Sequence, residues 1–483
     1  MKTPIYSALS IKCWEKRWFD EGNSSFGLMK QASLAICFQV IDFIKNNNIC
    51  QADIIIWCGV GNNGGDGYLT AKYLSDYLCG HDFTVQIFAP NTPKSADAIR
   101  AKSASLGVAM YGDWANICRQ FEKAIHIDAL FGNGLDRLLD DDNVSLIELF
   151  NHQNGTKIAL DVPSGLHPDT GVPMPVCTQV DVTLCVLGLK IGLFVGMAKD
   201  FVGQIINLPI IPPDASLSVL AYLSDKPTPR ARQKTAHKGH FGTVAIIGGH
   251  ERMGGAVIMA SQMAMSVGAG RVTAICHARH HGAILTRSPN VMVMDIEHDV
   301  DWASFDRVAF GMGLGRDDWA RVIYDKVMTI LLQHPFDKVV LDADALYFLA
   351  KNPVKLPNHV ICTPHSAESA RLLGVSVADV DGDKWTALQN LHAKYGGQWV
   401  IKGANTLSFD GCDVYVCPFG NPYMATAGMG DILAGMMAGL DADIHEVVAW
   451  HGIMGDELAK HRPFGIHAHE MVDMVKAVGL YHV

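Results

Sequence analysis

Short apolar runs of strand length recur along the chain, and each ends in glycines or an aspartate before a helical pattern begins. Apolar strands that alternate with helices predict parallel sheets covered on both faces, since consecutive parallel strands need a crossover helix. We therefore expect an α/β fold throughout. The runs in the first half are Ile54–Cys58, Thr84–Phe88, Ile125–Ile127, Ile158–Leu160 and Val182–Leu187. Those in the second half are Val244–Ile247, Val272–Ile275, Val308–Phe310, Val339–Leu341, Val360–Cys362 and Trp399–Ile401.

A seam rich in proline and basic residues separates two such regions, between Leu208 and Lys238. The 483 residues are enough for two or three domains at roughly 150 residues each. We expect one domain over residues 1–215 and a second over residues 226–483.

Charge and cysteine content exclude several classes of protein. A net charge of −10 argues against a nucleic-acid or membrane-surface binder, because both need a basic footprint. The twelve cysteines form no CxxC pair, which is typical of reduced thiols. The most apolar stretch, Val182–Ile211, is interrupted by Lys190, Lys199 and Asp200, and we expect it not to span a bilayer. These features predict a soluble cytoplasmic protein.

The loop after the first predicted strand carries a ligand signal. Cys58–Gly67 reads CGVGNNGGDG and precedes a helical pattern. Glycines let the backbone approach a ligand, and the helix N-terminus favours an anion there. A plain tight turn is the alternative, but the side-chain oxygens of Asn62, Asn63 and Asp66 favour binding.

Two more loops at the same predicted sheet edge carry oxygen ligands. Asp128 ends one strand in DALFGNGL, and Asp161 ends another in LDVPSGL, which also holds Ser164. An unpaired aspartate is costly to bury. Three such loops together indicate one site, and this mix of oxygens suits a hard cation better than zinc.

The second half holds a glycine-rich turn, TAGMGDILAG, that ends in Asp431 at a predicted helix N-terminus. Backbone amides on a phosphate and a carboxylate beside them are what a phosphate-directed reaction on a hydroxyl requires. A flexible loop is the alternative, but Lys402 and His365 supply matching polar groups. The histidines of HARHH and GIHAHE lack acid or cysteine partners at metal-site spacing, and we interpret them as loop histidines.

About the first 210 residues resemble the NAD(P)H-hydrate epimerases of the YjeF family. The motifs that carry this resemblance are NNGGDG, DALFGNGL, LDVPSGL and LGLKIGL, which contains Lys190. The resemblance implies a Rossmann-like domain that interconverts the R and S epimers of hydrated NADH or NADPH. Epimerisation at a hydrated carbon needs a placed acid or base, and Asp161 is our candidate for it. The resemblance also implies potassium (K⁺) ligands at Asn63, Asp128 and Ser164. Implied nucleotide contacts are Asn62, Asn63, Gly64, Gly65, Asp66, Gly132, Asn133, Gly134, Leu135, Asp136, Arg137, Leu138 and Asp161. The chain departs from the family at Lys30 and Gln31, where LMKQAS replaces an LMExAG-like pattern.

Residues 226–483 resemble the ribokinase-like, ADP-dependent NAD(P)H-hydrate dehydratase domain of the same family of repair enzymes. The motifs that carry this resemblance are LDADAL, TPHSAE, KGANT and GMGD. By this resemblance Asp431 is the base, ADP is the co-substrate and Mg²⁺ assists. Implied contacts to the hydrated dinucleotide are Gly254, Ala256, Gly313, His365 and Asp431. Implied contacts to the adenine nucleotide are Lys402, Gly403, Ala404, Asn405, Thr406 and Gly430. Tyr423 and Ala427 stand where the family has glycines, and a left-handed backbone at Ala427 would impair the turn.

Together the two resemblances predict a bifunctional repair enzyme acting on small molecules, and the ribokinase-like half suggests a homo-oligomer. A small-molecule kinase with a fused nucleotide-binding domain is the alternative, and a binding scaffold whose catalysis has decayed is a third hypothesis. The choices between NADHX and NADPHX, and between ADP and ATP, stay open at this point.

Overall fold

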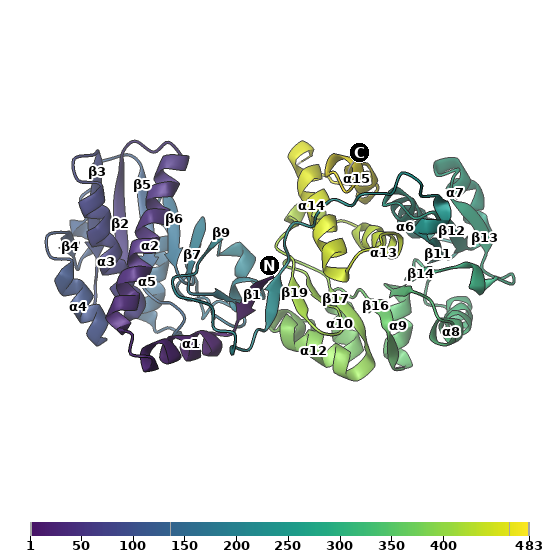
Figure 1. Ribbon diagram of the computed structural model, residues 1–483, viewed down its shortest axis with the longest axis horizontal. Helices are drawn as coiled ribbons and strands as arrows, with labels where there is room; N and C mark the ends of the chain where they lie inside the picture. The colour runs from purple at the N-terminus through teal and green to yellow at the C-terminus, as the bar shows by residue number, and fades with distance from the viewer. Residues whose placement is uncertain (1, 136, 463, 482–483) are drawn as a thin grey trace. The chain divides into compact units, whose positions relative to one another are not determined.

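The computed structural model describes residues 2–135, 137–462 and 464–481, which form two compact units (Figure 1). The N-terminal unit is Pro4–Ala221. The C-terminal unit is the rest of the described chain, from Tyr222 onward together with Lys2 and Thr3. Both units are α/β and both are built mainly on parallel strands, as predicted.

The N-terminal unit has a seven-stranded sheet in the order β4-β3-β2-β5-β6-β7-β9, with every neighbouring pair parallel. Its strands are β2 (Ala52–Cys58), β3 (Phe83–Phe88), β4 (Ala109–Tyr111), β5 (Ala124–Ala129), β6 (Thr156–Leu160), β7 (Val182–Val186) and β9 (Gln204–Leu208). Two further strands, β1 (Thr3–Tyr6) and β8 (Leu189–Lys190), pair with each other in parallel. Its helices are α1 (Ala8–Asp20), α2 (Ser25–Asn46), α3 (Asn62–Tyr77), α4 (Ala96–Ala104) and α5 (Asp141–Asn151).

Helices cover both faces of this sheet, and every position of β2 is buried. Ile54 and Ile56 pack with α2, α3 and α4 in one buried cluster. Ile55 and Trp57 point the other way and pack against α5, as the alternation of a strand requires. The chain runs outward from β2 to β4 and then, from β5, in the opposite direction. The strand order therefore reverses between β2 and β5, where open α/β sheets bind ligands.

The bounds of the strands predicted in this unit differ from the predicted runs by at most two residues. Strand β7 ends at Val186 rather than Leu187, because Leu187 turns the chain with a φ of +66°. Helix α2 is the one helix in the described part of the chain that is long and apolar enough to cross a membrane. Half of its most apolar window is buried within the protein, and its residues join the cluster beneath the sheet, as in a core helix.

The C-terminal unit has a sheet in the order β13-β12-β11-β14-β15-β16-β17-β18-β19-β10, parallel from β13 to β17. The pairs β17–β18 and β18–β19 are antiparallel, contrary to the expectation of parallel strands alone. The loops joining them are too short for a crossover helix. The strands are β10 (Ala221–Leu223), β11 (Thr243–Gly248), β12 (Arg271–Cys276), β13 (Met292–Asp295), β14 (Arg307–Met312), β15 (Lys338–Leu341), β16 (Leu356–Cys362), β17 (Gly396–Ile401), β18 (Leu407–Phe409) and β19 (Val414–Val416).

The helices of this unit include two apolar ones, α6 and α13, that pack against each other in its largest buried cluster. All twelve cysteines of the chain are free, as predicted. The helices are α6 (Gly254–Ser266), α7 (His281–Arg287), α8 (Asp318–Gln333), α9 (Asp344–Lys351), α10 (Ser366–Leu373), α11 (Val377–Gly382), α12 (Lys384–Tyr395), α13 (Met429–Gly439), α14 (Ile444–His461) and α15 (Met471–Ala477).

Candidate functional site

The glycine-rich loop of the N-terminal unit joins β2 to α3, as the sequence predicts. A Cβ on Gly59 would lie 1.9 Å from the Leu130 carbonyl oxygen, and one on Gly64 would lie 2.0 Å from the Gly59 carbonyl oxygen. Side chains are therefore sterically excluded at both positions. The tight loop brings the end of β2 against the end of β5. It places Asn62 and Asn63 in the first turn of α3 and Asp66 just after that turn.

A cavity of about 840 Å³ opens at the carboxyl ends of β2, β5, β6 and β7. Most of the residues that the resemblance assigned to the nucleotide line it, namely Asn62, Asn63, Asp66, Gly132, Asn133, Gly134, Leu135, Arg137, Leu138 and Asp161. Gly64 and Gly65 are instead buried in the packing of α3. Asp136 lies outside the described residues. The three predicted loops thus meet at one cavity.

A network of polar atoms lies beside this cavity and meets its lining at Asn63 and Phe131. Asp128 is fully buried, and it accepts hydrogen bonds from the Ser164 amide (2.8 Å), the Ser164 hydroxyl (2.6 Å) and the Thr178 hydroxyl (2.7 Å). Burial raises the pKa of Asp128, while these hydrogen bonds oppose the rise. Asn63 donates from Nδ2 to the Phe131 carbonyl oxygen at 2.7 Å, and the Ser164 hydroxyl lies 3.2 Å from the same oxygen.

This network is of the kind that suits a hard cation. Carboxylate, hydroxyl and carbonyl oxygens of Asp128, Ser164 and Phe131 lie together there, and such oxygens are the ligands that hard cations prefer. The sequence missed Thr178, which no motif marks, although it holds Asp128 in place.

Asp161 forms an ion pair with Lys190 of β8, and Lys190 is fully buried while Asp161 is 15% exposed. Burial opposes the charge on Lys190, but Asp161 beside it raises the pKa of the lysine above its usual value. Lys190 also donates to the Val186 carbonyl oxygen at 2.7 Å, and Asp161 accepts from the Asn133 amide at 3.1 Å. Asp161 adopts a φ of +68°, which is uncommon outside glycine. These contacts hold the Asp161 carboxylate at the cavity wall.

Helix α1 adds three residues to the cavity that the sequence reading missed: Ile11, Lys12 and Glu15. Its N-cap is Ser7, and Ile11 and Trp14 are buried on its inner face, which brings Glu15 to the cavity. Burial, and then the Asp161 charge, raises the pKa of Glu15. The only sequence signal was this helical spacing of apolar residues, since no motif lies in the segment.

The departure at Lys30 and Gln31 leaves the cavity intact. Lys30 lies on the exposed side of α2 with its ammonium over the Phe26 ring, 5.0 Å from the ring centroid. Ser33 stands at the end of the same motif and is fully buried. Its hydroxyl lies 2.8 Å from the Met29 carbonyl oxygen and 3.2 Å from the Asp66 carbonyl oxygen. Helix α2 therefore contacts the start of α3 through Ser33.

In the C-terminal unit, the glycine-rich turn precedes α13 and places Asp431 in its first turn. Burial, and next the charge of Asp342, raises the pKa of Asp431 to about 7. The residue with a left-handed backbone is Gly428, with a φ of +94°, and not Ala427. The expected strain at Ala427 is therefore absent, because its neighbour takes the strained position. Tyr423 is 41% exposed and packs its ring on Phe464.

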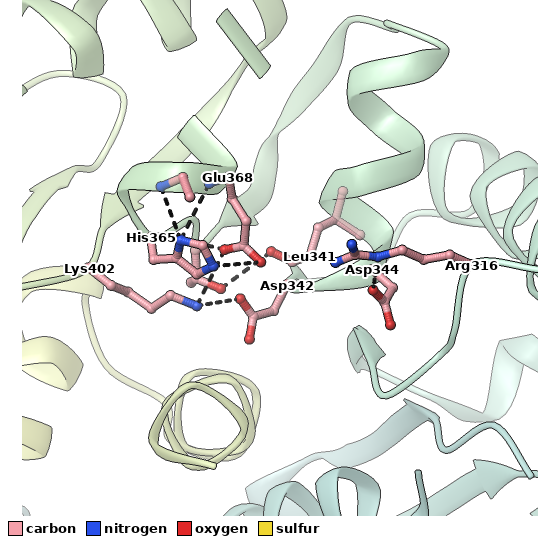
Figure 2. A network of polar contacts seen from close by, with 9 residues as sticks. Arg316, Leu341, Asp342, Asp344, His365, Glu368 and Lys402 are labelled. Atoms are coloured by element: carbon pink, nitrogen blue, oxygen red, sulfur yellow. Dashed lines mark hydrogen bonds and ion pairs between the residues drawn. The ribbon is translucent and has the colours of Figure 1, made fainter. Parts of the chain in front are cut away.

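Lys402, at the end of β17, lies in a network with Asp342 and Glu368 (Figure 2). Its Nζ atom donates to Asp342 Oδ1 at 2.7 Å and lies 3.9 Å from Glu368 Oε2. Burial opposes its charge, but the two carboxylates raise the pKa of Lys402 above its usual value. A Cβ on Gly430 would lie 3.2 Å from Lys402 Nζ and 3.4 Å from Asp342 Oδ2. The network therefore lies beside the first turn of α13.

His365 is the N-cap of α10. Its Nδ1 atom accepts from the Ala367 amide at 3.1 Å, and Glu368 accepts from the His365 amide at 2.9 Å (Figure 2). Burial lowers the pKa of His365 and raises that of Glu368. This capping box orients Glu368 toward Lys402. Asp342 and Glu368 belong to motifs that the sequence singled out, but their pairing with Lys402 was not foreseen.

Asp342 and Asp344 point in opposite directions, although one residue separates them (Figure 2). Asp344 pairs with Arg316 at 2.7 Å and accepts from the Gly315 amide at 2.9 Å. Ala343 between them has a φ of +50° and a ψ of −115°, a conformation that normally requires glycine. This strained residue makes the divergence possible.

The remaining predicted residues fall into two groups. The first group lies at the start of α6, which begins at Gly254 and includes Ala256. Gly313 has a φ of +60°, and a Cβ built on Gly313 would lie 3.1 Å from the Cβ of Ala256. Gly313 therefore packs against the start of this helix. Residues 402–406 form the loop from β17 to β18, in which the Thr406 hydroxyl donates to the Gly403 carbonyl oxygen and Lys384 donates to the Ala404 carbonyl oxygen. Asn405 has a φ of +50°.

Both halves of the chain match known families. The family matching residues 25–192 is described as the YjeF-related protein N-terminus, and that matching residues 244–476 as NAD(P)H-hydrate dehydratase. The bifunctional NAD(P)H-hydrate repair enzyme Nnr of Vibrio cholerae is 38% identical over 91% of this chain and 89% of its own. Its namesake from Escherichia coli is 34% identical over 84% and 80%. The solved ADP/ATP-dependent NAD(P)H-hydrate dehydratase of Bacillus subtilis is 27% identical, with a TM-score of 0.46, over 52% of this chain and 93% of that one.

Proposed function

The chain belongs to the family of bifunctional NAD(P)H-hydrate repair enzymes, and on that premise we propose how its residues divide the work. The protein repairs hydrated nicotinamide cofactors by epimerisation and dehydration. We assign epimerisation of the R and S hydrates to residues 1–215, and dehydration of the S hydrate to residues 226–483. The alternative, a small-molecule kinase with a fused nucleotide-binding domain, is less well supported, because the repair enzymes are similar to this chain along both of its halves.

The cavity of the N-terminal unit is our site for epimerisation. A dinucleotide would lie along the α3 N-terminus, where free backbone amides favour its phosphates. A K⁺ ion would be held by Asn63, Asp128 and Ser164. The Ser164 hydroxyl contacts both the Asp128 carboxylate and the Phe131 carbonyl oxygen, and the Asn63 side-chain amide donates to the same carbonyl. The charge of the ion would help to fix the loops that position Asp161.

The first turn of α13 is our site for dehydration. Asp431 takes the proton from the ring hydroxyl, which attacks the terminal phosphoryl group of ADP and releases AMP. Loss of phosphate from that carbon, with a proton from the neighbouring carbon, then restores NAD(P)H. A pKa of about 7 suits a base that works near neutral pH. This placement of a buried carboxyl beside Lys402 and a helix N-terminus is the observation that carries the proposal.

The remaining groups of this site follow from their positions. Lys402 and the loop to Thr406, with Gly430, would hold ADP, and Gly254, Ala256, Gly313 and His365 would contact the hydrated ring and its dinucleotide. Mg²⁺ in phosphoryl-transfer sites is held by one or two carboxylates with the substrate's phosphates, and the carboxylates of Asp342 and Glu368 fit that requirement. When bound, it neutralises charge on the phosphoryl group.

A mixture of R- and S-NADHX, incubated with Mg²⁺, K⁺ and either ADP or ATP, tests both assignments. Recovery of NADH absorbance from both epimers, faster than spontaneous epimerisation, supports the two activities and identifies the phosphate donor. Recovery that stalls after one epimer leaves only dehydration. No recovery with either nucleotide contradicts the assignment.

Two substitutions then locate the base. Asp431→Ala is expected to abolish dehydration and to leave epimerisation intact. The control is Asp318→Asn, at a carboxylate that is 97% exposed, which is expected to leave both activities unchanged. Dehydration retained by Asp431→Ala would remove Asp431 from the mechanism.

A further inference from the structure

Four carboxyl groups line the N-terminal cavity. Asp140 is exposed to solvent, whereas Glu15 of α1, Asp66 of α3 and Asp161, which follows β6, are partly buried. One buried ammonium, that of Lys190, faces them, and it is paired with Asp161. Lys12 also lines the cavity, but it is exposed to solvent. Two of the three partly buried carboxyl groups therefore lack a buried counter-charge, and like charges so placed cannot all ionise.

Ionisation is opposed more strongly at Asp66 than at Glu15. Its carboxyl has no hydrogen-bond or ion-pair partner among the described residues. Burial, and then the charges of Asp161 and Glu15, raises the pKa of Asp66 well above its usual value. The other charged groups at the cavity are Lys12, Arg137 and Asp140 on its lining. Helices α2 and α4, which pack on α3, turn Lys30 and Arg100 onto the Phe26 ring instead.

The chemistry of the substrate requires two such groups. Hydration of the enamine in a reduced nicotinamide ring places the hydroxyl on the carbon bonded to the ring nitrogen. Inversion there is easiest by breaking the carbon–oxygen bond, because the nitrogen lone pair forms a carbon–nitrogen double bond as water leaves. An acid must protonate the departing hydroxyl, and a base must take a proton from the water that adds to the other face.

Resting on the proposed epimerase function, we propose that Asp66 protonates the departing hydroxyl and that Asp161, ionised in its pair with Lys190, takes the proton from the incoming water. One water is released and one is consumed, so the atoms balance. The two carboxyls end with exchanged protonation states, so the reverse reaction, or proton exchange with solvent, resets them. Asp66 follows β2 in the chain and Asp161 follows β6. Strand β5 lies between these two strands, so β2 and β6 are about 10 Å apart in the sheet.

Glu15 acts as a positioning residue for Asp66. Its charge on α1 disfavours ionisation of the Asp66 carboxyl, and thus helps the acid to stay protonated. Glu15 lies before the segment that matches the epimerase family, residues 25–192, so it is not part of the motifs by which this site is recognised.

The test follows the oxygen atom. The full chain is incubated with pure R-NADHX and K⁺ in H₂¹⁸O, without ADP, and the S epimer is analysed by mass spectrometry. The proposal expects one ¹⁸O in each S molecule formed by the enzyme. Retention of ¹⁶O would mean that the ring nitrogen–carbon bond opens instead, and would overturn the proposal. If the wild-type chain does not interconvert the epimers at all, the proposed function itself fails.

Variants separate the acid from a structural role. Asp66→Asn is expected to lower the epimerisation kcat by ~100-fold or more, the usual contribution of a general acid, with little change in KM. Dehydration of S-NADHX should be unaffected, and Asp142→Asn, at an exposed carboxylate on α5, is the control. An Asp66→Asn chain that keeps its thermal stability and epimerises within threefold of wild type would overturn the assignment.

Glu15→Gln gives an independent readout. An acid works while protonated, so epimerisation falls as the pH rises through the pKa of Asp66. Removal of the Glu15 charge lowers that pKa, and the alkaline limb of the profile should therefore move to lower pH, with kcat at pH 6 within about twofold of wild type. A limb that stays in place would contradict the role of Glu15.

Discussion

Asp342→Asn should change the pH dependence of dehydration in a defined direction. The pKa of Asp431 is about 7 against a usual value of 3.8, a difference of about 3 units or roughly 4 kcal/mol. Burial is the largest cause, and the Asp342 charge is the next. The substitution leaves the burial of Asp431 unchanged. It removes the repulsion from the Asp342 charge, and it leaves the positive charge of Lys402 less neutralised. Each of these two changes lowers the pKa of Asp431. We take the decrease as ~1 unit, about 1.4 kcal/mol.

A base acts when ionised, so the acid limb of the kcat profile should move from about pH 7 to about pH 6. At pH 6 the ionised fraction of Asp431 rises from about one tenth to about one half, whereas at pH 8 it changes little. The assay is NADH recovery from S-NADHX between pH 5.5 and 8.5 at saturating Mg²⁺. The kcat values are normalised to their plateau, because Asp342 is also the partner of Lys402 and a proposed Mg²⁺ ligand. Asp318→Asn is the matched control. An acid limb that stays at pH 7, or moves upward, would refute the electrostatic reasoning.

Three further outcomes are expected. Ala343→Gly should raise the free energy of unfolding by ~1 kcal/mol in urea titration, because glycine adopts its backbone conformation without strain; a destabilised variant would show that the strain is not there. Asp128→Asn should lower the stability of the N-terminal unit by at least ~2 kcal/mol, because the amide nitrogen of the new side chain would face the donors of Ser164 or Thr178. Thermal unfolding measures this loss of stability, and an unchanged unfolding midpoint would contradict the prediction. Chelation of Mg²⁺ by EDTA should stop dehydration while R-to-S interconversion of NADHX continues, and loss of both activities would break the assignment of Mg²⁺ to one site.

The arrangement of strands and glycine-rich loops was predictable because both depend on local patterns. Apolar runs such as Ile54–Cys58 identify buried strands, and parallel strands bring their following loops to one edge. The position of a strained residue was not predictable: glycine spacing suggested Ala427, but the left-handed turn falls on Gly428.

Pairings between distant residues were also beyond the sequence. The motifs around Asp342 and Lys402 are 60 residues apart, and their contact depends on how β15 and β17 lie in the sheet. Glu15 was missed for a related reason. It reaches the cavity through the packing of an ordinary amphipathic helix, and such a helix has no chemical signature.

The place of α1 separates two borders that are often treated as one. The segment by which the epimerase family is recognised begins at residue 25, whereas the wall of the cavity begins at Ile11. A fragment cut at the recognised border would keep every glycine-rich loop and the Asp161–Lys190 pair, yet one side of the cavity would be open to water. Two proteins that agree in every motif can thus differ in how dry, and how acidic, their reaction chamber is. Agreement in the motifs therefore does not by itself predict that a second chain has a helix closing this side of the cavity.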